Sequence, residues 1–83
     1  MDAQATAYET YEISPRFRQT VEERIARLER DAASDELAIA HLHNEDHIRR
    51  HRRMITLQRS EALRMRIFLD RARTREVRPL VQL

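Results

Sequence analysis

The chain has 83 residues, a formal net charge of +2 and no glycine, cysteine or tryptophan. Without cysteine it can form neither disulfides nor thiolate metal sites. Without glycine it cannot build the loops that cradle phosphates, and the tight turns and bulges of an all-β fold are disfavoured. Ala, Glu, Leu and Arg supply 43 of the 83 residues, a composition typical of long helices and coiled coils.

The charge is distributed unevenly along the chain. Residues 1–48 carry five arginines and eleven acids, a formal charge of −6, whereas residues 49–83 carry eleven arginines and three acids, a formal charge of +8. All 16 basic residues are arginine, whose planar guanidinium is suited to binding carboxylates or phosphates. The second half of the chain is therefore the candidate for binding an anionic partner.

The first predicted element is a helix that follows a short arm. Residues 1–13 show no sustained hydrophobic period, and we interpret them as a flexible N-terminal arm. Ser14 and Pro15 mark a helix start, because serine is a preferred N-cap and proline fits the first helical position. From Arg16 to Arg78 there is neither glycine nor proline in 63 residues. Any break in that stretch must therefore come from capping residues.

Two segments offer such a break, Ser34 to Glu36 and Asn44 to Asp46, each a capping residue followed by two acids. We favour the second, because the hydrophobic register changes there. This predicts one helix over residues 15–42 and another over 45–77, ended by Pro79 and followed by a C-terminal tail, 79–83. The fold class is all-α. The two helices form either an antiparallel hairpin or one bent rod.

Apolar residues on both predicted helices follow the alternating spacing of three and four residues that coiled coils show. Two such helices make a seam rather than a closed core, so we expect residues 14–78 to form a coiled-coil-like oligomer, either a homodimer or a complex with a larger protein. The predicted seam comprises Val21, Ile25, Leu28, Ile39, Leu42, Ile48, Ile55, Ala62, Met65, Phe68, Leu69 and Ala72.

The second predicted helix has a basic face that comprises Arg50, Arg52, Arg59, Arg64, Arg66, Arg71 and Arg73. These arginines could bind nucleic-acid phosphates, pair with acids on another helix, or keep the helix solvated. We favour pairing, because in an antiparallel hairpin the acids of the first helix would face the second helix. Glu22, Glu23 and Glu29 would lie across from residues 59–66, and Asp31, Asp35 and Glu36 across from residues 50–59.

Four histidines, His41, His43, His47 and His51, surround the predicted break. Histidines four residues apart on one helix face can share a zinc ion, but the segment lacks the His-Glu-x-x-His order and the break separates its members. We predict no metal site.

Asn44, His51 and Gln58 form either a polar layer in the seam, where a histidine could make assembly sensitive to pH, or an exposed stretch.

No serine in the chain has a base and an orienting acid at plausible positions, and 83 residues are too few to enclose a cleft. We therefore expect no enzyme activity, no cofactor and no small-molecule substrate. No apolar run approaches a membrane span and no secretory segment is evident, so we expect a cytoplasmic protein without a membrane partner. The sequence favours a non-enzymatic helical module that binds or regulates a larger protein. The alternative is a nucleic-acid-binding accessory protein that uses the arginine-rich helix.

Overall fold

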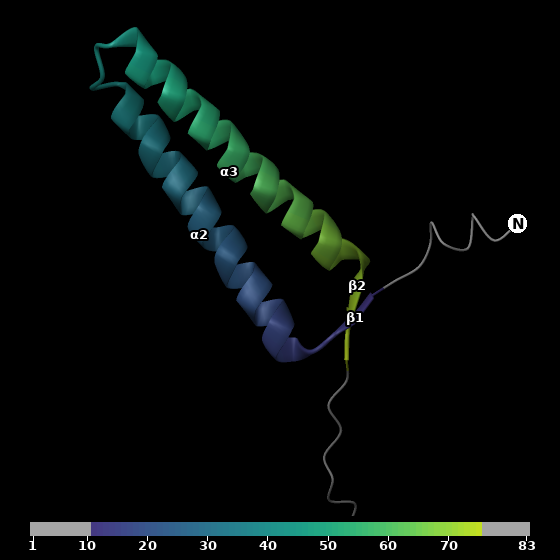
Figure 1. Ribbon diagram of the computed structural model, residues 1–83. Helices are drawn as coiled ribbons and strands as arrows, with labels where there is room; N and C mark the ends of the chain where they lie inside the picture. Colours follow the sequence, from purple (N-terminus) through teal and green to yellow (C-terminus); the bar gives the residue numbers. More distant parts are fainter. Residues whose placement is uncertain (1–10, 76–83) are drawn as a thin grey trace, which may run out of the picture.

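The computed structural model describes residues 11–75. The elements follow in the order β1 (Tyr11–Ile13), α2 (Pro15–Ile39), α3 (Glu45–Arg71) and β2 (Ala72–Thr74). The two helices lie side by side and run in opposite directions, joined by a short turn at one end (Figure 1). The predicted all-α class is confirmed, and of the two predicted arrangements the structure has the antiparallel hairpin.

Helix α2 begins where the sequence predicts. The Ser14 side-chain oxygen accepts a hydrogen bond from the backbone N–H of Phe17 at 3.1 Å, and Pro15 occupies the first turn. This cap satisfies one of the backbone N–H groups that a helix start leaves without an internal partner. The direction in which the chain enters the hairpin is thus set by two adjacent residues.

The break favoured at Asn44 is confirmed. Its side-chain oxygen accepts hydrogen bonds from the backbone N–H groups of Asp46 at 2.8 Å and of His47 at 3.2 Å. Glu45 and Asp46 lie in the first turn of α3, where negative charge is favourable. The first helix ends at Ile39 rather than at residue 42, because the chain tightens into a turn in which the N–H of Leu42 donates to the carbonyl of Ile39 at 3.0 Å.

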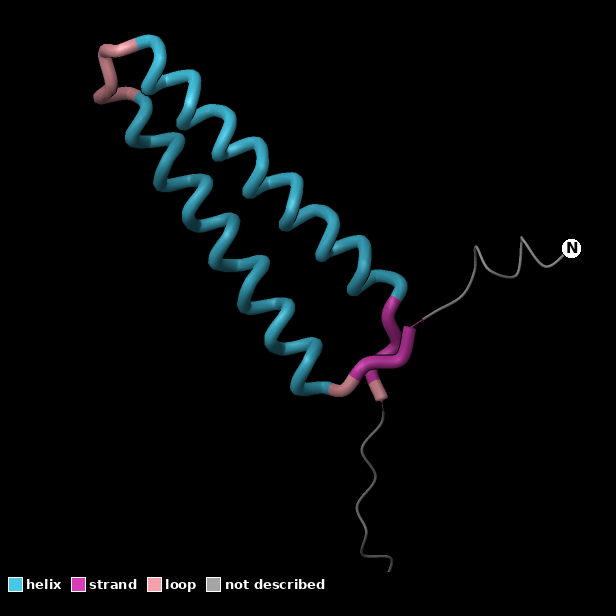
Figure 2. Tube along the Cα trace, in the orientation of Figure 1, coloured by secondary structure: helices cyan, strands magenta, loops and turns pink. Residues whose placement is uncertain are grey.

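At the other end of the hairpin, β1 and β2 form a parallel pair (Figure 2). Parallel strands need a crossover connection, and here α2, the turn and α3 together supply it. The register places Ile13 opposite Thr74, and the N–H of Arg75 donates to the carbonyl of Ile13 at 2.7 Å.

The strands differ from the sequence-based expectation at two places. Residues 11–13 belong to a strand and not to the expected arm, because Ile13 is only 8% exposed and packs in the core. Helix α3 ends at Arg71 and not at residue 77, because residues 72–74 leave the helix to pair with β1. The rest of the expected arm and the expected tail 79–83, with Pro79, lie outside the described residues.

The apolar core lies toward the strand end of the hairpin. Ile13, Ile25, Ala62 and Leu69 form one buried cluster, while Ala32 and Ile55 are buried nearer the turn. Both helices are amphipathic, with a narrow apolar stripe toward each other and mostly polar or charged residues elsewhere. Neither α2 nor α3 carries an apolar stretch long enough to cross a membrane.

Candidate interaction surface

The predicted seam lies between α2 and α3 of a single chain. Every one of its members is buried or partly buried. Leu42 lies in the turn and Ala72 in β2, and the others lie on α2 or α3, where helical spacing turns each apolar stripe toward the other helix. The hairpin therefore covers within one molecule the apolar surface that was expected to require an oligomer. The buried members are Ile25, Ile55, Ala62 and Leu69, and the partly buried ones are Val21, Leu28, Ile39, Leu42, Ile48, Met65, Phe68 and Ala72.

On one flank of the seam, two arginines of α3 bind acids of α2. Arg66 donates from Nε and Nη2 to the two carboxylate oxygens of Glu29, at 2.9 and 2.7 Å, a bidentate arrangement. Arg59 donates to Glu36 at 2.7 Å. Hydrogen bonding from each guanidinium lowers the pKa of the facing carboxyl and raises the pKa of the arginine itself.

On the opposite flank the arginine belongs to α2 and the acid to α3: Arg24 donates to Glu61 at 2.8 Å. All three cross-helix pairs are solvent-exposed, so each contributes little to stability. Their positions nevertheless match only the antiparallel register, and they discriminate against the parallel pairing of the same stripes.

The remaining members of the predicted basic face separate into different environments. Arg52 lies on the same flank as Arg59, whereas Arg73 belongs to β2 and sits opposite Glu12 in the strand register. Arg73 therefore does not share a helix face with Arg59 and Arg66, because α3 ends at Arg71. Arg50, Arg64 and Arg71 are exposed on α3, and within residues 11–75 no ion pair involves them.

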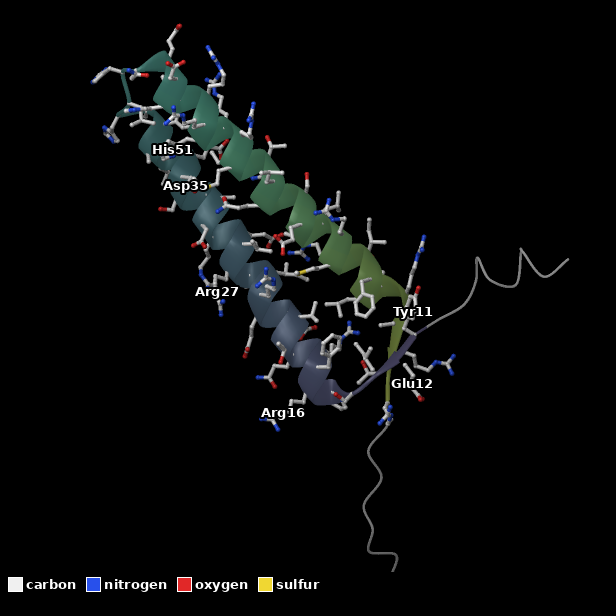
Figure 3. The ribbon with its side chains drawn as sticks, in the orientation of Figure 1. Tyr11, Glu12, Arg16, Arg27, Asp35 and His51 are labelled. Atoms are coloured by element: carbon white, nitrogen blue, oxygen red, sulfur yellow. The ribbon has the colours of Figure 1, made fainter. Side chains whose placement is uncertain are left out.

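Two of the three predicted polar-layer residues lie in the seam. His51 and Gln58 are partly buried, and the His51 Nδ1 and Gln58 Oε1 atoms are buried without a hydrogen-bond partner in the described part of the chain. Asp35 of α2 is partly buried as well and lies near His51 in the turn-proximal half (Figure 3). Asn44 is not in the seam, because it caps α3.

The histidines do not share one helix face. His41 and His43 precede the Asn44 cap, His47 is exposed in the first turn of α3, and His51 lies in the seam. Across the described residues, no group of three or more His, Cys, Asp or Glu side chains is placed to hold a metal ion.

An aromatic cluster lies where β1 meets the helices, and the sequence analysis missed it. The Phe68 ring stacks on Tyr11 with centroids 5.6 Å apart and meets Phe17 edge-on at 6.2 Å. Tyr11 and Phe17 each remain about half exposed. The only local indication of this cluster in the sequence is that Phe17 lies one helical turn before Val21. Tyr11 joins the cluster through the pairing of β1 with β2, which no local pattern indicates.

Large apolar side chains outside the predicted seam also remain exposed along α3. The four on α3 are Met54, Leu57, Leu63 and Ile67. Elsewhere among the described residues, Tyr11, Phe17 and Leu37 are also exposed. Apolar residues scattered singly on a surface are ordinary, whereas a contiguous apolar patch marks a site of association. Helix α3 is therefore both the more basic and the more apolar outer surface of the hairpin.

Comparison of the chain with models of protein families, with curated proteins and with solved structures finds no match.

Proposed function

We propose that this chain is a non-enzymatic helical interaction module that binds a larger protein partner. The observation that carries the proposal is the set of four large apolar side chains exposed on α3 after the hairpin has closed its own seam. Aliphatic side chains of this size contribute binding free energy when a partner removes them from water. They add nothing to the binding of phosphate groups.

The nucleic-acid alternative is favoured by the arginines of α3 that have no acid partner among the described residues, such as Arg50 and Arg64. Against it, Arg59 and Arg66 are already bound to Glu36 and Glu29, so two of the strongest phosphate-binding candidates are occupied. The aromatic side chains cluster at the strand end and not between the arginines, where single-strand binding would use them as stacking platforms.

The experiment is affinity capture of the full chain from its native host after nuclease treatment, combined with a duplex-DNA binding titration. We expect a protein to be retained in a fixed ratio to the chain and to survive nuclease. Six phosphate contacts would make DNA affinity fall roughly a thousandfold between about 50 and 200 mM salt. Tight DNA binding with that salt dependence, and no nuclease-resistant protein, would replace the proposal with the alternative.

A further inference from the structure

The face of α3 that points away from α2 carries a regular stripe. Its members are spaced alternately by four and three residues, so they lie one above another on the helix, half a turn from the buried Ile55, Ala62 and Leu69. We call this set the outer stripe: Arg53, Leu57, Ser60, Arg64, Ile67 and Arg71. All of them except the partly buried Ser60 are exposed.

Helix α2 has a face at the equivalent position with a different composition. Over residues 16–34 the same spacing selects polar and charged residues, all exposed: Arg16, Thr20, Glu23, Arg27, Arg30 and Ser34. The next position, near the turn, is Leu37, which is 75% exposed. Arg16 and Arg27 point away from α3 into solvent (Figure 3). Along most of its length this face has the composition of an ordinary solvated helix surface, and its one aliphatic member lies near the turn. The outer stripe differs in having two aliphatic residues, Leu57 and Ile67, between its arginines.

The charges of the outer stripe restrict which protein surface can bind to it. Arg53, Arg64 and Arg71 form no ion pair with any described residue. A second copy of the chain would place these arginines against each other, or against the face of α2 with its three arginines and one glutamate. Like charges in contact are unfavourable, so neither of these two faces of a second copy complements the outer stripe, whereas a surface that supplies carboxylates does.

We propose that the outer stripe docks an amphipathic helix of a partner protein, with an apolar face flanked by acidic residues. The inference rests on the proposed function and specifies its site and partner chemistry. Leu57 and Ile67 would fill the apolar face of the incoming helix, and the three guanidinium groups would bind its flanking carboxylates. From Arg53 to Arg71 the stripe is about 27 Å long at 1.5 Å per residue, which a partner helix of about 20 residues spans.

The test uses a displayed library of amphipathic helices of about 20 residues with a varied apolar face and glutamate on both flanks. A matched library carries lysine in place of glutamate. We expect the full-length protein to enrich helices from the acidic library alone. Enrichment from neither library, or equally from both, would overturn the proposal.

Variants of the full chain then locate the binding surface. Leu57→Ser with Ile67→Ser, and separately Arg53→Gln with Arg64→Gln and Arg71→Gln, should each weaken the enriched helices at least about tenfold. The matched α2 variant, Arg16→Gln with Arg27→Gln and Arg30→Gln, should leave affinity within about twofold. Because all the substituted side chains are exposed, helicity should not change. An equal loss in the α2 variant would overturn the proposal.

Two further results separate this inference from the proposed function. A host protein captured equally by the wild type and by the Leu57→Ser/Ile67→Ser variant would overturn the outer stripe as its site and leave the proposed function standing. Duplex DNA binding that needs the three outer-stripe arginines but ignores the two aliphatic substitutions would assign the stripe to nucleic acid. Failure to capture any host protein counts against the proposed function whatever the library yields.

Discussion

Burial along α3 changes completely within two residues. Ile55 is 6% exposed in the seam, whereas Leu57 is 62% exposed in the outer stripe, because two steps along a helix rotate a side chain by about 200°. The two residues have the same size and similar chemistry. Their roles in stability are therefore separable by substitution.

We predict that Ile55→Asp destabilises the protein by more than about 3 kcal/mol, since it removes a buried aliphatic group and places a carboxylate in an apolar contact. Leu57→Asp is the matched control and should change the free energy of unfolding by no more than about 0.5 kcal/mol. Urea denaturation followed by circular dichroism measures both. Similar losses in the two variants would contradict the helix orientation described above.

The cross-helix carboxylates should make stability depend on pH in the acid range. Hydrogen bonds from Arg66 and Arg59 lower the pKa of Glu29 and of Glu36 from the ordinary value of 4.5. A pKa lowered by folding means that the stabilising contribution is fully present above the unfolded value and is lost as pH falls through the folded value. The affected window therefore lies below about pH 4.5.

We predict that Glu29→Gln with Glu36→Gln modestly lowers the Tm at neutral pH and reduces its further decrease below pH 4.5, the ordinary pKa of both carboxyls. Glu23→Gln with Asp31→Asn removes the same charge from exposed positions of α2 that make no ion pair with a described residue, so it should leave the pH profile closer to wild type. Thermal melts from neutral to acid pH at low salt supply the comparison. Added salt should shrink the difference, because exposed pairs are screened. Identical profiles for the two variants would count against the pairs.

At the scale of the element, residues 40–44 separate the two helices, and the last of them caps α3. Asn44 is extended and accepts two backbone hydrogen bonds at the start of α3. Neither glycine nor proline is present in the turn, and no described residue adopts a positive φ. The reversal of the chain therefore depends on capping chemistry rather than on a residue that forbids a helix.

We predict that Asn44→Ala lowers the free energy of unfolding by about 1 kcal/mol, because two N–H groups lose their acceptor. Asn44→Asp keeps an acceptor and should retain most of the wild-type stability. Ser34→Ala replaces an exposed serine inside α2 and should be neutral or slightly stabilising. Denaturation of the three variants gives the ranking. A loss in Ser34→Ala as large as in Asn44→Ala would mean that residue 34, and not residue 44, shapes the hairpin.

At the scale of the whole molecule, the core is small. Only six of the described residues are buried hydrophobics, and the turn-proximal half of the seam contains polar groups such as His51 and Gln58. Chains of this length bury too little apolar surface to be strongly stable alone and are commonly supported by association. The half-exposed Tyr11 and Phe17, and Met54 and Leu63 of α3 outside the outer stripe, leave apolar surface for that purpose.

We predict that the isolated protein associates at low micromolar concentration and loses helicity on dilution. Sedimentation equilibrium should show at least a dimer. Circular dichroism over a concentration series provides the second measurement, because coupled folding and association make helicity depend on concentration. A fully helical species of 10.0 kDa that does not change with concentration would contradict the prediction.

The sequence by itself determined the features that depend on neighbouring residues. The caps at Ser14 and Asn44 and the apolar stripes of both helices follow from residue type and helical spacing. These signals are local, because a cap involves residues two or three positions apart and a helix face is defined by its period.

Only the tertiary structure showed that the apolar stripes of α2 and α3 pack against each other within one chain. It also showed that β1 and β2 pair at the end of the hairpin opposite the turn. The strand pairing that buries Ile13 and ends α3 at Arg71 joins segments at opposite ends of the described chain. The hydrogen bond from Arg18 to Thr74 spans 56 positions. The exposure of Leu57 and Ile67 likewise follows from closure of the hairpin. The pairing of Arg59 with Glu36 and of Arg66 with Glu29 agrees with the predicted antiparallel arrangement, but the choice between hairpin and bent rod came from the structure. Such contacts depend on how the elements pack, and the propensities of single residues carry no information about packing between distant segments.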